Sequence, residues 1–517
     1  MRGFPISLLL SVLLALPLAA QSPATAPAIT LGPGTMGWEF RSGRVTLTAP
    51  PDPGPLTGLP VIDPKAEGNA ALLLRRLWAR GEAAGLAGVL YDNRDRGHSR
   101  LAPTEFPQLT PLRYGALMQE RGLDYGLAGP VLLQGPVIGN SSTAVTSGAL
   151  ARSLPRMAMT TREGPALAWE GYAANRIYVY PEHRDHDDVD RFPANWPYMV
   201  ISQGSSHSDR PFLRALAMTL AAFRPETRAR LEAEGLVAPT LQMILRRTRA
   251  GSATAYLTGA AHPTVFDSET LKPAQMVSLA NALAPGEIPP LVRIRVEAED
   301  FADAAGPAGR SERFFDTPSA VARIWRGPGY SREMIVSAAE TVDPNGRDLP
   351  FRWVLLRGDP QKVRITPRDG GARARIAIDW HDPFPIARID GRMTSRVDIG
   401  IFAENGAWIS APAILSVSFP SHEARRWEAG PDGAMRLAEV DYDAIGRDVG
   451  FDPALHVSAP WRDHYLYGPD GEFLGWEREN GGKSRRFAPD GTVDGRLPVY
   501  EIQDRGRRPE LREVPEN

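Results

Sequence analysis

The sequence predicts a multidomain protein with an N-terminal α/β (or α+β) module, a β-sandwich after it, and a C-terminal region rich in β-hairpins. Strand-like and helix-like segments alternate up to about residue 288, which is typical of a mixed α/β module. A proline-rich stretch over residues 285–290 suits a domain boundary, and short strands separated by turn residues follow it. The expected domains are residues 36–288, 291–420 and 421–502.

The first twenty residues (1–20) have the pattern of a secretory signal peptide. Arg2 gives a positive start, residues 6–18 are apolar, and Ala19-Ala20 offers a small-residue cleavage site. The apolar run is shorter than the roughly 20 residues that cross a bilayer as a helix. An uncleaved anchor is the alternative, because Leu18 fits the cleavage rule poorly. We expect a linker over residues 21–35 and a secreted or periplasmic mature chain without a membrane span.

Composition limits the possible chemistry. The 517 residues include no cysteine, which excludes disulfides, thiolate metal ligands and a cysteine nucleophile. Any metal would therefore need His, Asp or Glu ligands. Lys and Arg number 59 against 61 Asp and Glu, a net charge of −2. A broad basic surface is typical of nucleic-acid binding, so nucleic acid is not an expected partner.

In the first module, apolar periodicity indicates strands at residues 44–47 and 87–91 and a helix over residues 70–84. Asn69 is the expected cap of that helix. Its expected apolar face consists of Leu72, Leu73, Leu77 and Trp78. Further helices are expected at residues 209–223, 225–234, 240–248 and 273–283.

The region after the proline-rich stretch contains a recognisable turn and strand. Asp343-Pro344-Asn345-Gly346 has the composition of a tight turn, and Leu349, Phe351 and Trp353 alternate so that they share one strand face. Residues 337–353 as a whole resemble the polycystic-kidney-disease (PKD) type of immunoglobulin-like domain, and the match extends over about residues 330–420. The resemblance implies a sandwich that serves as a spacer or as a carbohydrate-binding or adhesive accessory, without catalytic activity of its own.

The last hundred residues contain three Pro-Asp-Gly turns, at residues 431–433, 469–471 and 489–491. Aromatic residues flank the second turn, so this region is expected to form consecutive β-hairpins. Residues 503–517 are charged and are expected to form a flexible tail.

Three polar clusters follow apolar strands and are the candidate sites. In residues 180–188, imidazoles and carboxylates lie close enough in sequence to bind a divalent metal ion, and a solvated polar loop is the alternative. This cluster is the best metal candidate in a chain without thiols. Its expected ligands are His183, Asp185, His186 and Asp187.

The second cluster, residues 202–209, lies between a strand and a helix N-terminus, an arrangement that favours anion binding. Ser205, Ser206 and His207 are the expected catalytic residues, and Gln203 and Asp209 are the expected ligand-binding residues. Helix capping by Ser208 or Asp209 is the alternative explanation.

The third cluster, residues 92–99, combines carboxylates with an arginine and a histidine, the groups needed for acid–base chemistry or for binding sugar hydroxyls. A salt-bridged turn is the alternative. The expected catalytic residues are Asp92, Asp95 and His98; Arg94, together with Asn140 from a fourth and weaker polar loop, is expected to bind ligand.

One geometric hypothesis joins these clusters. If the strands that end near Tyr91, Ile138, Tyr180 and Ile201 are parallel, their polar loops meet at one edge of the sheet and form one cleft. An antiparallel pair would place the loops at opposite ends. Segments 91–99, 178–187 and 203–209 also resemble a group of uncharacterised secreted bacterial proteins, which implies that they belong to one module and supplies no mechanism.

Two classes of function remain open. The first is a hydrolase or lyase that acts on an extracellular polymer such as a glycan, with a polysaccharide or cell-envelope component as partner. No cofactor is certain for it, and a divalent metal ion is the candidate. The second is a non-enzymatic ligand-binding or cell-surface adhesion protein. Loops that converge in a concave site favour the enzyme, whereas scattered loops favour the binding protein.

Overall fold

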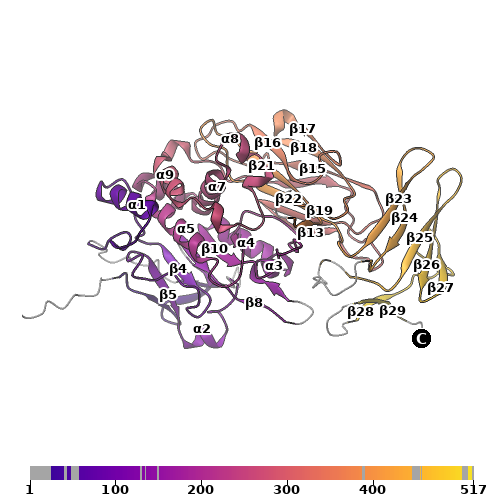
Figure 1. Cartoon of the computed structure of the whole chain (residues 1–517), viewed down its shortest axis with the longest axis horizontal. Coiled ribbons are helices and arrows are strands. Elements are labelled where there is room, and N and C mark those ends of the chain that lie inside the picture. The colour runs from indigo at the N-terminus through magenta and orange to yellow at the C-terminus, as the bar shows by residue number, and fades with distance from the viewer. Residues whose placement is uncertain are drawn as a thin grey trace, which may run out of the picture.

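The structure is a computed structural model in which three parts follow one another along the long axis of the molecule (Figure 1). The expected signal peptide lies outside the described residues. Within the described part of the chain, none of the helices combines the length and the apolar composition that crossing a bilayer requires. The described residues are 25–514 except 40–43, 48–57, 128–130, 134, 148–150, 387–390, 445–454, 456 and 504–509.

A six-stranded parallel sheet forms the centre of the N-terminal module. Its strands lie in the order β1-β5-β4-β7-β10-β11, and each neighbouring pair is parallel. This arrangement selects the α/β alternative over α+β, because parallel strands need long crossovers that place helices over the sheet. The strands are β1 (Ile29–Leu31), β4 (Leu90–Asn93), β5 (Thr110–Tyr114), β7 (Val137–Asn140), β10 (Arg176–Pro181) and β11 (Val200–Ser202).

Helices lie on both faces of this sheet. Side chains alternate along each strand, so Asp92, Gly139 and Tyr178 share one face, which α3 and α4 cover. Asn140 lies on the other face, where α5 begins, and α1 and α9 pack against α5. The helices are α1 (Asn69–Ala79), α2 (Ala116–Glu120), α3 (Leu154–Thr160), α4 (Gly164–Ala173), α5 (Arg210–Ala222), α6 (Pro225–Ala233), α7 (Val237–Ala250), α8 (Ala253–Tyr256) and α9 (Pro273–Ala282).

The expected helices are present, but the expected face of the first is partly wrong. Ala71 and Leu74 of α1 are fully buried, whereas Leu72 and Trp78 are 42% and 37% exposed. Small alanines occupy the contact with the neighbouring helices, so the larger side chains at 72 and 78 lie outside it. The cap of this helix is Gly68 and not Asn69.

Two segments that were expected to lack structure contain strands. Ile29–Leu31, inside the expected linker, forms β1 at the edge of the parallel sheet, and Leu31 is fully buried there. In the expected tail, β29 (Glu510–Glu513) pairs with β28 (Tyr500–Gln503), and Leu511 is buried. Strand β1 pairs with the distant strand β5, which local composition does not reveal. Strand β29 forms a hairpin with the neighbouring strand β28, and the backbone N–H of Leu511 also donates to the Ser458 carbonyl.

Two sheets that share one apolar core form the middle part of the molecule. One sheet has the order β12-β15-β18-β17 and is antiparallel; the other has the order β13-β14-β22-β21-β16, in which only β14 and β22 pair in parallel. The strands are β12 (Arg295–Glu299), β13 (Arg313–Thr317), β14 (Ala320–Ile324), β15 (Ser331–Ser337), β16 (Phe351–Arg357), β17 (Val363–Arg368), β18 (Arg373–Asp379), β21 (Arg396–Ala403) and β22 (Ala413–Ser418).

The second of these sheets is covered on both faces. Val321 of β14 belongs to the core between the two sheets, while its neighbours Ala320 and Ala322 belong to the core of the N-terminal module. Val397 and Phe402 of β21 are divided between the two cores in the same way. The N-terminal module and the sandwich therefore share a large apolar interface.

A buried cluster of charged side chains crosses this interface. Arg396 of β21 contacts Asp190 at 3.0 Å and Asp398 at 2.8 Å, and Arg357 of β16 also pairs with Asp190. Burial alone would raise the pKa of Asp190, but Arg396 and Arg357 hold it well below its ordinary value. The cluster places a carboxylate of one module against guanidinium groups of the other, which fixes how the two modules dock.

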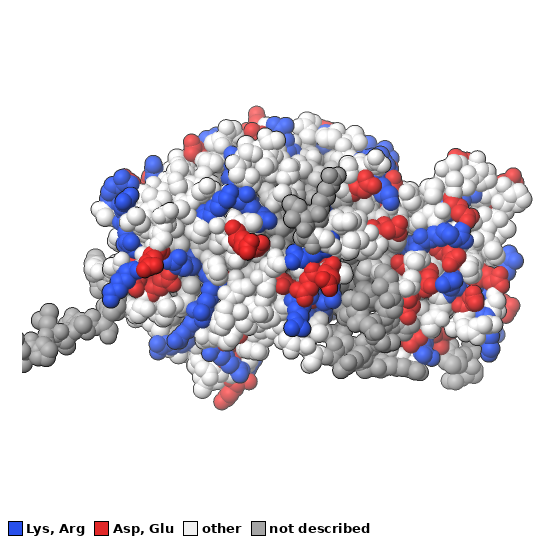
Figure 2. Space-filling view, in the orientation of Figure 1, with Lys and Arg blue, Asp and Glu red and all other residues white. Residues whose placement is uncertain are grey.

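The C-terminal part is a five-stranded antiparallel sheet with its own small core. Its order is β23-β24-β25-β26-β27, and the expected Pro-Asp-Gly turns are present: the backbone N–H of Gly433, Gly471 and Gly491 each donates to a carbonyl three residues earlier. On the face that Figure 2 shows, acidic and basic side chains are interspersed. The strands are β23 (Ala424–Ala429), β24 (Met435–Asp441), β25 (Arg462–Tyr467), β26 (Phe473–Asn480) and β27 (Lys483–Phe487).

Replacing Arg396 by leucine should destabilise the whole molecule, because Asp190 and Asp398 would remain buried and share one cation, Arg357, in place of two. Breaking a buried ion pair in this way costs about 3–5 kcal/mol. Arg364→Leu is the matched control: Arg364 pairs with Asp379 at 2.7 Å on the surface, where such a pair is worth about 0–1 kcal/mol. Urea unfolding followed by tryptophan fluorescence measures both variants, and equal losses would contradict a role for the interface cluster.

Candidate active site

The polar loops after β4, β7, β10 and β11 meet at the carboxyl edge of the parallel sheet, which confirms the part of the geometric hypothesis that concerns the strands and their loops. Asp95, after β4, accepts hydrogen bonds from the backbone N–H and the hydroxyl of Ser142, after β7. His183, after β10, contacts the carbonyl oxygen of Ser142 at 2.6 Å. Asn140, at the end of β7, donates to Asp209, after β11. Loops from four strands are thus joined by direct hydrogen bonds.

His98 is held by a carboxylate on one side of its ring. Its Nδ1 lies 3.2 Å from Asp95 Oδ2 and 2.8 Å from Ser142 Oγ, and its side chain is 49% exposed. A carboxylate can only accept, and the Ser142 hydroxyl already donates to Asp95, so Nδ1 carries the proton and donates it. The lone pair of neutral His98 is consequently on Nε2, where it can accept a proton.

His207 contacts a hydroxyl with the same ring nitrogen. Its Nδ1 lies 3.1 Å from Ser99 Oγ, which also accepts a hydrogen bond of 3.0 Å from the His207 backbone N–H. Ser99 Oγ lies 3.3 Å from Nδ1 of His98 as well. When His207 is protonated, both of its ring nitrogens carry a proton: Nδ1 donates to Ser99, and Nε2 is left to donate to a ligand. The two rings are stacked, with centroids 4.7 Å apart and planes inclined by 28°.

Asn140 joins the loops that carry this pair of histidines. Its side-chain oxygen accepts from the Tyr91 hydroxyl at 3.0 Å and from Asn93 at 3.1 Å, while its nitrogen donates to Asp209 at 2.6 Å and to the Ser99 carbonyl at 3.2 Å. All the hydrogen-bonding capacity of this buried amide is used. Asn140 therefore fixes the loops that carry both histidines and is a positioning residue.

Asp209 is fully buried directly before α5. Burial raises the pKa of its carboxyl, and the hydrogen bond from Asn140 opposes that shift. Its second oxygen, Oδ1, has no hydrogen-bond partner among the described residues. Titratable groups perturbed in this way are common at functional sites.

Backbone strain is concentrated at the same edge of the sheet. Eight described residues other than glycine have positive φ, and five of them lie in the loops that form this site. Strained conformations outside glycine persist only where the surrounding contacts enforce them, and they cluster at functional sites. The five residues are Arg96 (50°), Ser99 (53°), His183 (45°), Arg184 (72°) and His207 (77°).

The expected metal site does not form. Asp185 binds the backbone N–H and the hydroxyl of Ser153 and pairs with Arg156, whereas His186 faces Asp190 at 3.7 Å. Asp187 is exposed and His183 turns toward Ser142, so the four expected ligands point in different directions. The described residues contain no group of three or more His, Asp or Glu side chains that could hold a metal ion.

Asp92 and Arg94 are also separated from the site, because Asp92 lies on the other face of the sheet. The Asp92 carboxylate is fully buried and accepts from Arg94 at 2.9 Å, from Tyr114 at 2.7 Å and from Tyr178 at 2.6 Å. Both charges are satisfied internally and inaccessible to a ligand. The expectations of catalysis by Asp92 and of ligand binding by Arg94 are wrong for this reason.

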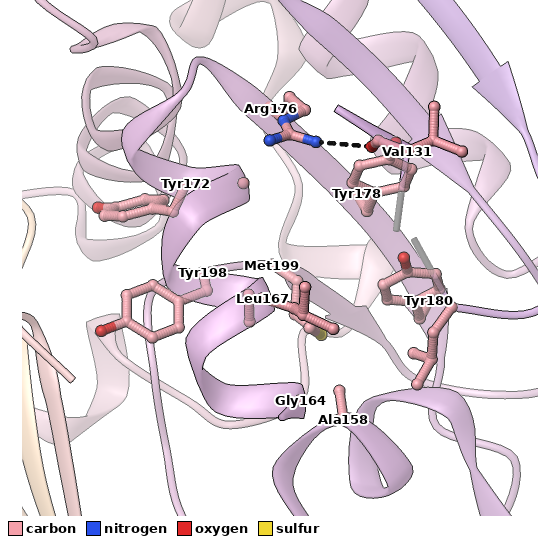
Figure 3. A pocket seen from close by; sticks show the side chains of 13 residues that line it. Val131, Ala158, Gly164, Leu167, Tyr172, Arg176, Tyr178, Tyr180, Tyr198 and Met199 are labelled. Carbon is pink, nitrogen blue, oxygen red and sulfur yellow. Dashed lines mark hydrogen bonds between the residues drawn. The ribbon is translucent and has the colours of Figure 1, made fainter. Parts of the chain in front are cut away.

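A tyrosine-lined pocket lies on that face, between β10 and α4 (Figure 3). Tyr178 and Tyr180 project into it from the strand, and Leu167 projects from the helix. Its volume of about 60 Å³ accommodates only a few water molecules, which is too small for a sugar ring. We therefore place the candidate site at the sheet edge and not in this pocket.

The serine hydroxyls that contact the two imidazoles are not the expected ones. They belong to Ser99 and Ser142, whereas Ser205 is exposed and Ser206 half-buried in the turn before α5. The backbone N–H of Gln203 donates to the Phe266 carbonyl, which attaches the turn to the following segment. Ser99 and Ser142 stand beside predicted site residues in the sequence, but only the fold shows that they bridge separate loops.

Glu182 is a further residue that the sequence did not single out. It is buried and accepts from the backbone N–H groups of Gly204 and His186, at 2.9 and 3.1 Å. Burial raises the pKa of Glu182, and these two hydrogen bonds oppose the shift. Glu182 thereby links the loop after β10 to the loop that carries His207.

The sequence has no match among protein-family models and no match among curated proteins. Among solved structures, a nucleoside hydrolase-related hypothetical protein from Saccharophagus degradans, described as associated with carbohydrate metabolism, aligns with 55% of this chain and 71% of its own. The two are 10% identical, with a TM-score of 0.18. A likeness at this level supports no argument about fold or activity.

We expect the stability of the protein to decrease as the pH falls below about 6.5, in part because of His183. Burial lowers the pKa of His183 from 6.5, so the unfolded chain binds a proton that the folded chain resists. The contribution is present above pH 6.5 and is lost as the pH falls through the lower folded value. His183→Gln keeps a donor for the Ser142 carbonyl and removes the titration.

Urea unfolding of the wild type and of His183→Gln at several values between pH 8 and 5.5 tests this expectation. The variant should lose less stability over that range than the wild type. Burial also lowers the pKa of His262, His381 and His422, so the pH dependence should be reduced and not abolished. Parallel pH profiles for the two proteins would contradict the assignment to His183.

Proposed function

We propose that this protein is a hydrolase or lyase that acts on an extracellular polymer such as a glycan, and that His98 and His207 are its catalytic acid–base pair. The stacked imidazoles carry this proposal, one held by a carboxylate and the other by a hydroxyl. Nε2 of neutral His98 can accept a proton and protonated His207 can donate one, which is what cleavage of a bond to oxygen requires. The convergence of four strand-end loops supports an enzyme over a passive binding surface.

In the hydrolytic form of the reaction, Nε2 of His98 accepts a proton from water as the water oxygen bonds to the electrophilic carbon of the substrate. The bond from that carbon to the leaving oxygen breaks, and the imidazolium form of His207 donates its Nε2 proton to that oxygen, which leaves His207 neutral. Asp95 stabilises the imidazolium that forms on His98, at 3.2 Å from its Nδ1. In the lyase form, His98 takes the proton from a substrate carbon and no water is added.

Asn140, Ser99 and Ser142 act through the two histidines and are positioning residues. Asp209 has no exposed surface and accepts from Asn140, so it also acts as a positioning residue. Because the described donor groups do not fit a metal ion, no step of this reaction passes through one.

A panel of polysaccharide and ester substrates tests the proposal, with His98→Asn and His207→Asn as the principal variants. General acid–base catalysis contributes about 10²–10⁴-fold, so each variant should lose at least about 100-fold in kcat. Asp95→Asn should lower kcat and shift its pH profile. Ser205→Ala and His464→Asn are controls; His464 lies on the C-terminal sheet beside Glu439. Turnover that survives in both principal variants would remove the pair from the mechanism.

We also propose that residues 291–420 form an immunoglobulin-like module of the PKD type and that the mature chain is secreted or periplasmic. The opposed sheet orders β12-β15-β18-β17 and β22-β21-β16, and the tight turn in which Gly346 N–H donates to the Asp343 carbonyl at 3.0 Å, support the first point. The signal-like start of the sequence supports the second, and N-terminal sequencing of exported protein tests it.

A second candidate function is saccharide binding without turnover. It is favoured by a cavity of about 340 Å³ on the C-terminal sheet, where Tyr465, Phe473 and Trp476 are among the lining residues. The Trp476 indole nitrogen is buried without a hydrogen-bond partner among the described residues. Retention on polysaccharide columns that Trp476→Phe lowers, in a protein without turnover on the whole panel, would select this function.

A further inference from the structure

A groove lies next to the loops that carry the candidate active site. It has a volume of about 890 Å³, and its walls are residues 100–105, the first half of α5, and part of residues 268–273. Arg100 directly follows Ser99, and Arg210 directly follows Asp209, so the groove continues from the two loops that hold the histidine pair. Its volume is that of a site for an extended ligand and exceeds what a single small ion needs.

The groove carries unbalanced positive charge. Three arginines line it, and Glu105 is the one acidic residue among the described residues of its lining. Arg214 pairs with Glu105 and also donates to the Glu67 carbonyl at 3.2 Å, so these two charges neutralise each other. Arg100 and Arg210 are exposed and form no ion pair within the described part of the chain. Two guanidinium groups therefore face the groove without a counter-charge.

The positive charge comes from the guanidinium groups and not from helix α5, because the N-cap of α5 is Asp209, whose carboxyl lies at the positive end of the helix dipole. Guanidinium groups bind carboxylates and sulfates through paired hydrogen bonds, and they are less strongly hydrated than an ammonium group. The groove also has apolar lining from Leu101, Pro103 and Leu271, which suits the less polar surfaces of a ligand that carries its charge at intervals.

We propose that this groove binds an acidic polysaccharide, with Arg100 and Arg210 holding its carboxylate or sulfate groups while the adjoining sugar unit lies against His98 and His207. This inference rests on the proposed function and specifies its substrate class. Uronic acid carboxylates and sugar sulfates are the two sources of such charge. The groove places the anionic groups beside the reacting unit, so the arginines act in substrate binding and do not take part in proton transfer.

Binding measurements on the full-length chain test the proposal. The inactive His98→Asn protein is titrated with polygalacturonate, with heparin and with neutral dextran, so that no polymer is consumed. The double variant Arg100→Gln/Arg210→Gln in the same background should bind the acidic polymers at least tenfold more weakly, with unchanged dextran binding. Arg121→Gln is the matched control, because Arg121 is an exposed arginine after α2, outside the groove lining. Comparing the two acidic polymers separates carboxylate from sulfate recognition.

The failures of the two proposals are distinguishable. If the double variant binds acidic polymer as tightly as its parent, or if dextran binds equally well, the groove assignment is overturned whatever the enzyme's turnover. Equal affinity for single-stranded nucleic acid or for inorganic phosphate overturns the assignment to glycans. If arginine-dependent binding is found but no polymer is cleaved, the proposed reaction is contradicted and the proposed binding of acidic polysaccharide in the groove is supported. In an active enzyme, the double variant should raise KM at least tenfold with little change in kcat.

Discussion

The register of the parallel sheet is the constraint on which the rest of the structure depends. Asp92 of β4, Gly139 of β7 and Tyr178 of β10 lie side by side, as do Asn93 and Asn140 one position later. A Cβ at Gly139 would fall onto the Tyr178 ring and within 2.8 Å of the Asp92 carbonyl. Glycine at this position lets the Tyr178 hydroxyl reach the Asp92 carboxylate, so one face of the sheet is closed by buried hydrogen bonds. The groups that can meet a ligand lie beyond the ends of the strands, at the carboxyl edge of the sheet.

The carboxyl edge of the sheet combines rigidity with accessibility. Asn140 and Glu182 tie together loops that are distant in sequence, and several residues with positive φ hold the histidines where relaxed backbone would not place them. Preorganisation of this kind lets a site act on a substrate without first reorganising itself. The adjoining arginines line the neighbouring groove, so the proposed chemistry and the proposed substrate binding occupy neighbouring parts of one surface.

Sequence periodicity was sufficient to predict most helices and strands, but it did not predict which strands pair. The helices near residues 209–283 were predicted close to their observed bounds, and short strands were expected where the sandwich lies, because each carries its own apolar pattern. Strand β1 was missed because its partner β5 is distant in sequence, and β29 was missed because the charged composition of the tail hid its hairpin with β28. The loop containing His183 and His186 looked like a metal site only because sequence proximity does not show side-chain direction. The catalytic role expected for Asp92 was wrong for a related reason: Asp92 and Asn93 are adjacent in sequence yet lie on opposite faces of the sheet.

The sheet β13-β14-β22-β21-β16, which is covered on both faces, affects how the chain can fold while it is being synthesised. Its strands β14 and β21 belong to two cores at once, so the surface of the N-terminal module that receives them stays uncovered until residues 291–420 exist. At about 5–20 residues per second, a ribosome needs on the order of ten seconds to make that stretch. During this interval a nascent chain that folded early would present an apolar, charge-bearing patch to its surroundings. A chaperone that keeps the first half of the chain from collapsing until the second half arrives would suit this architecture.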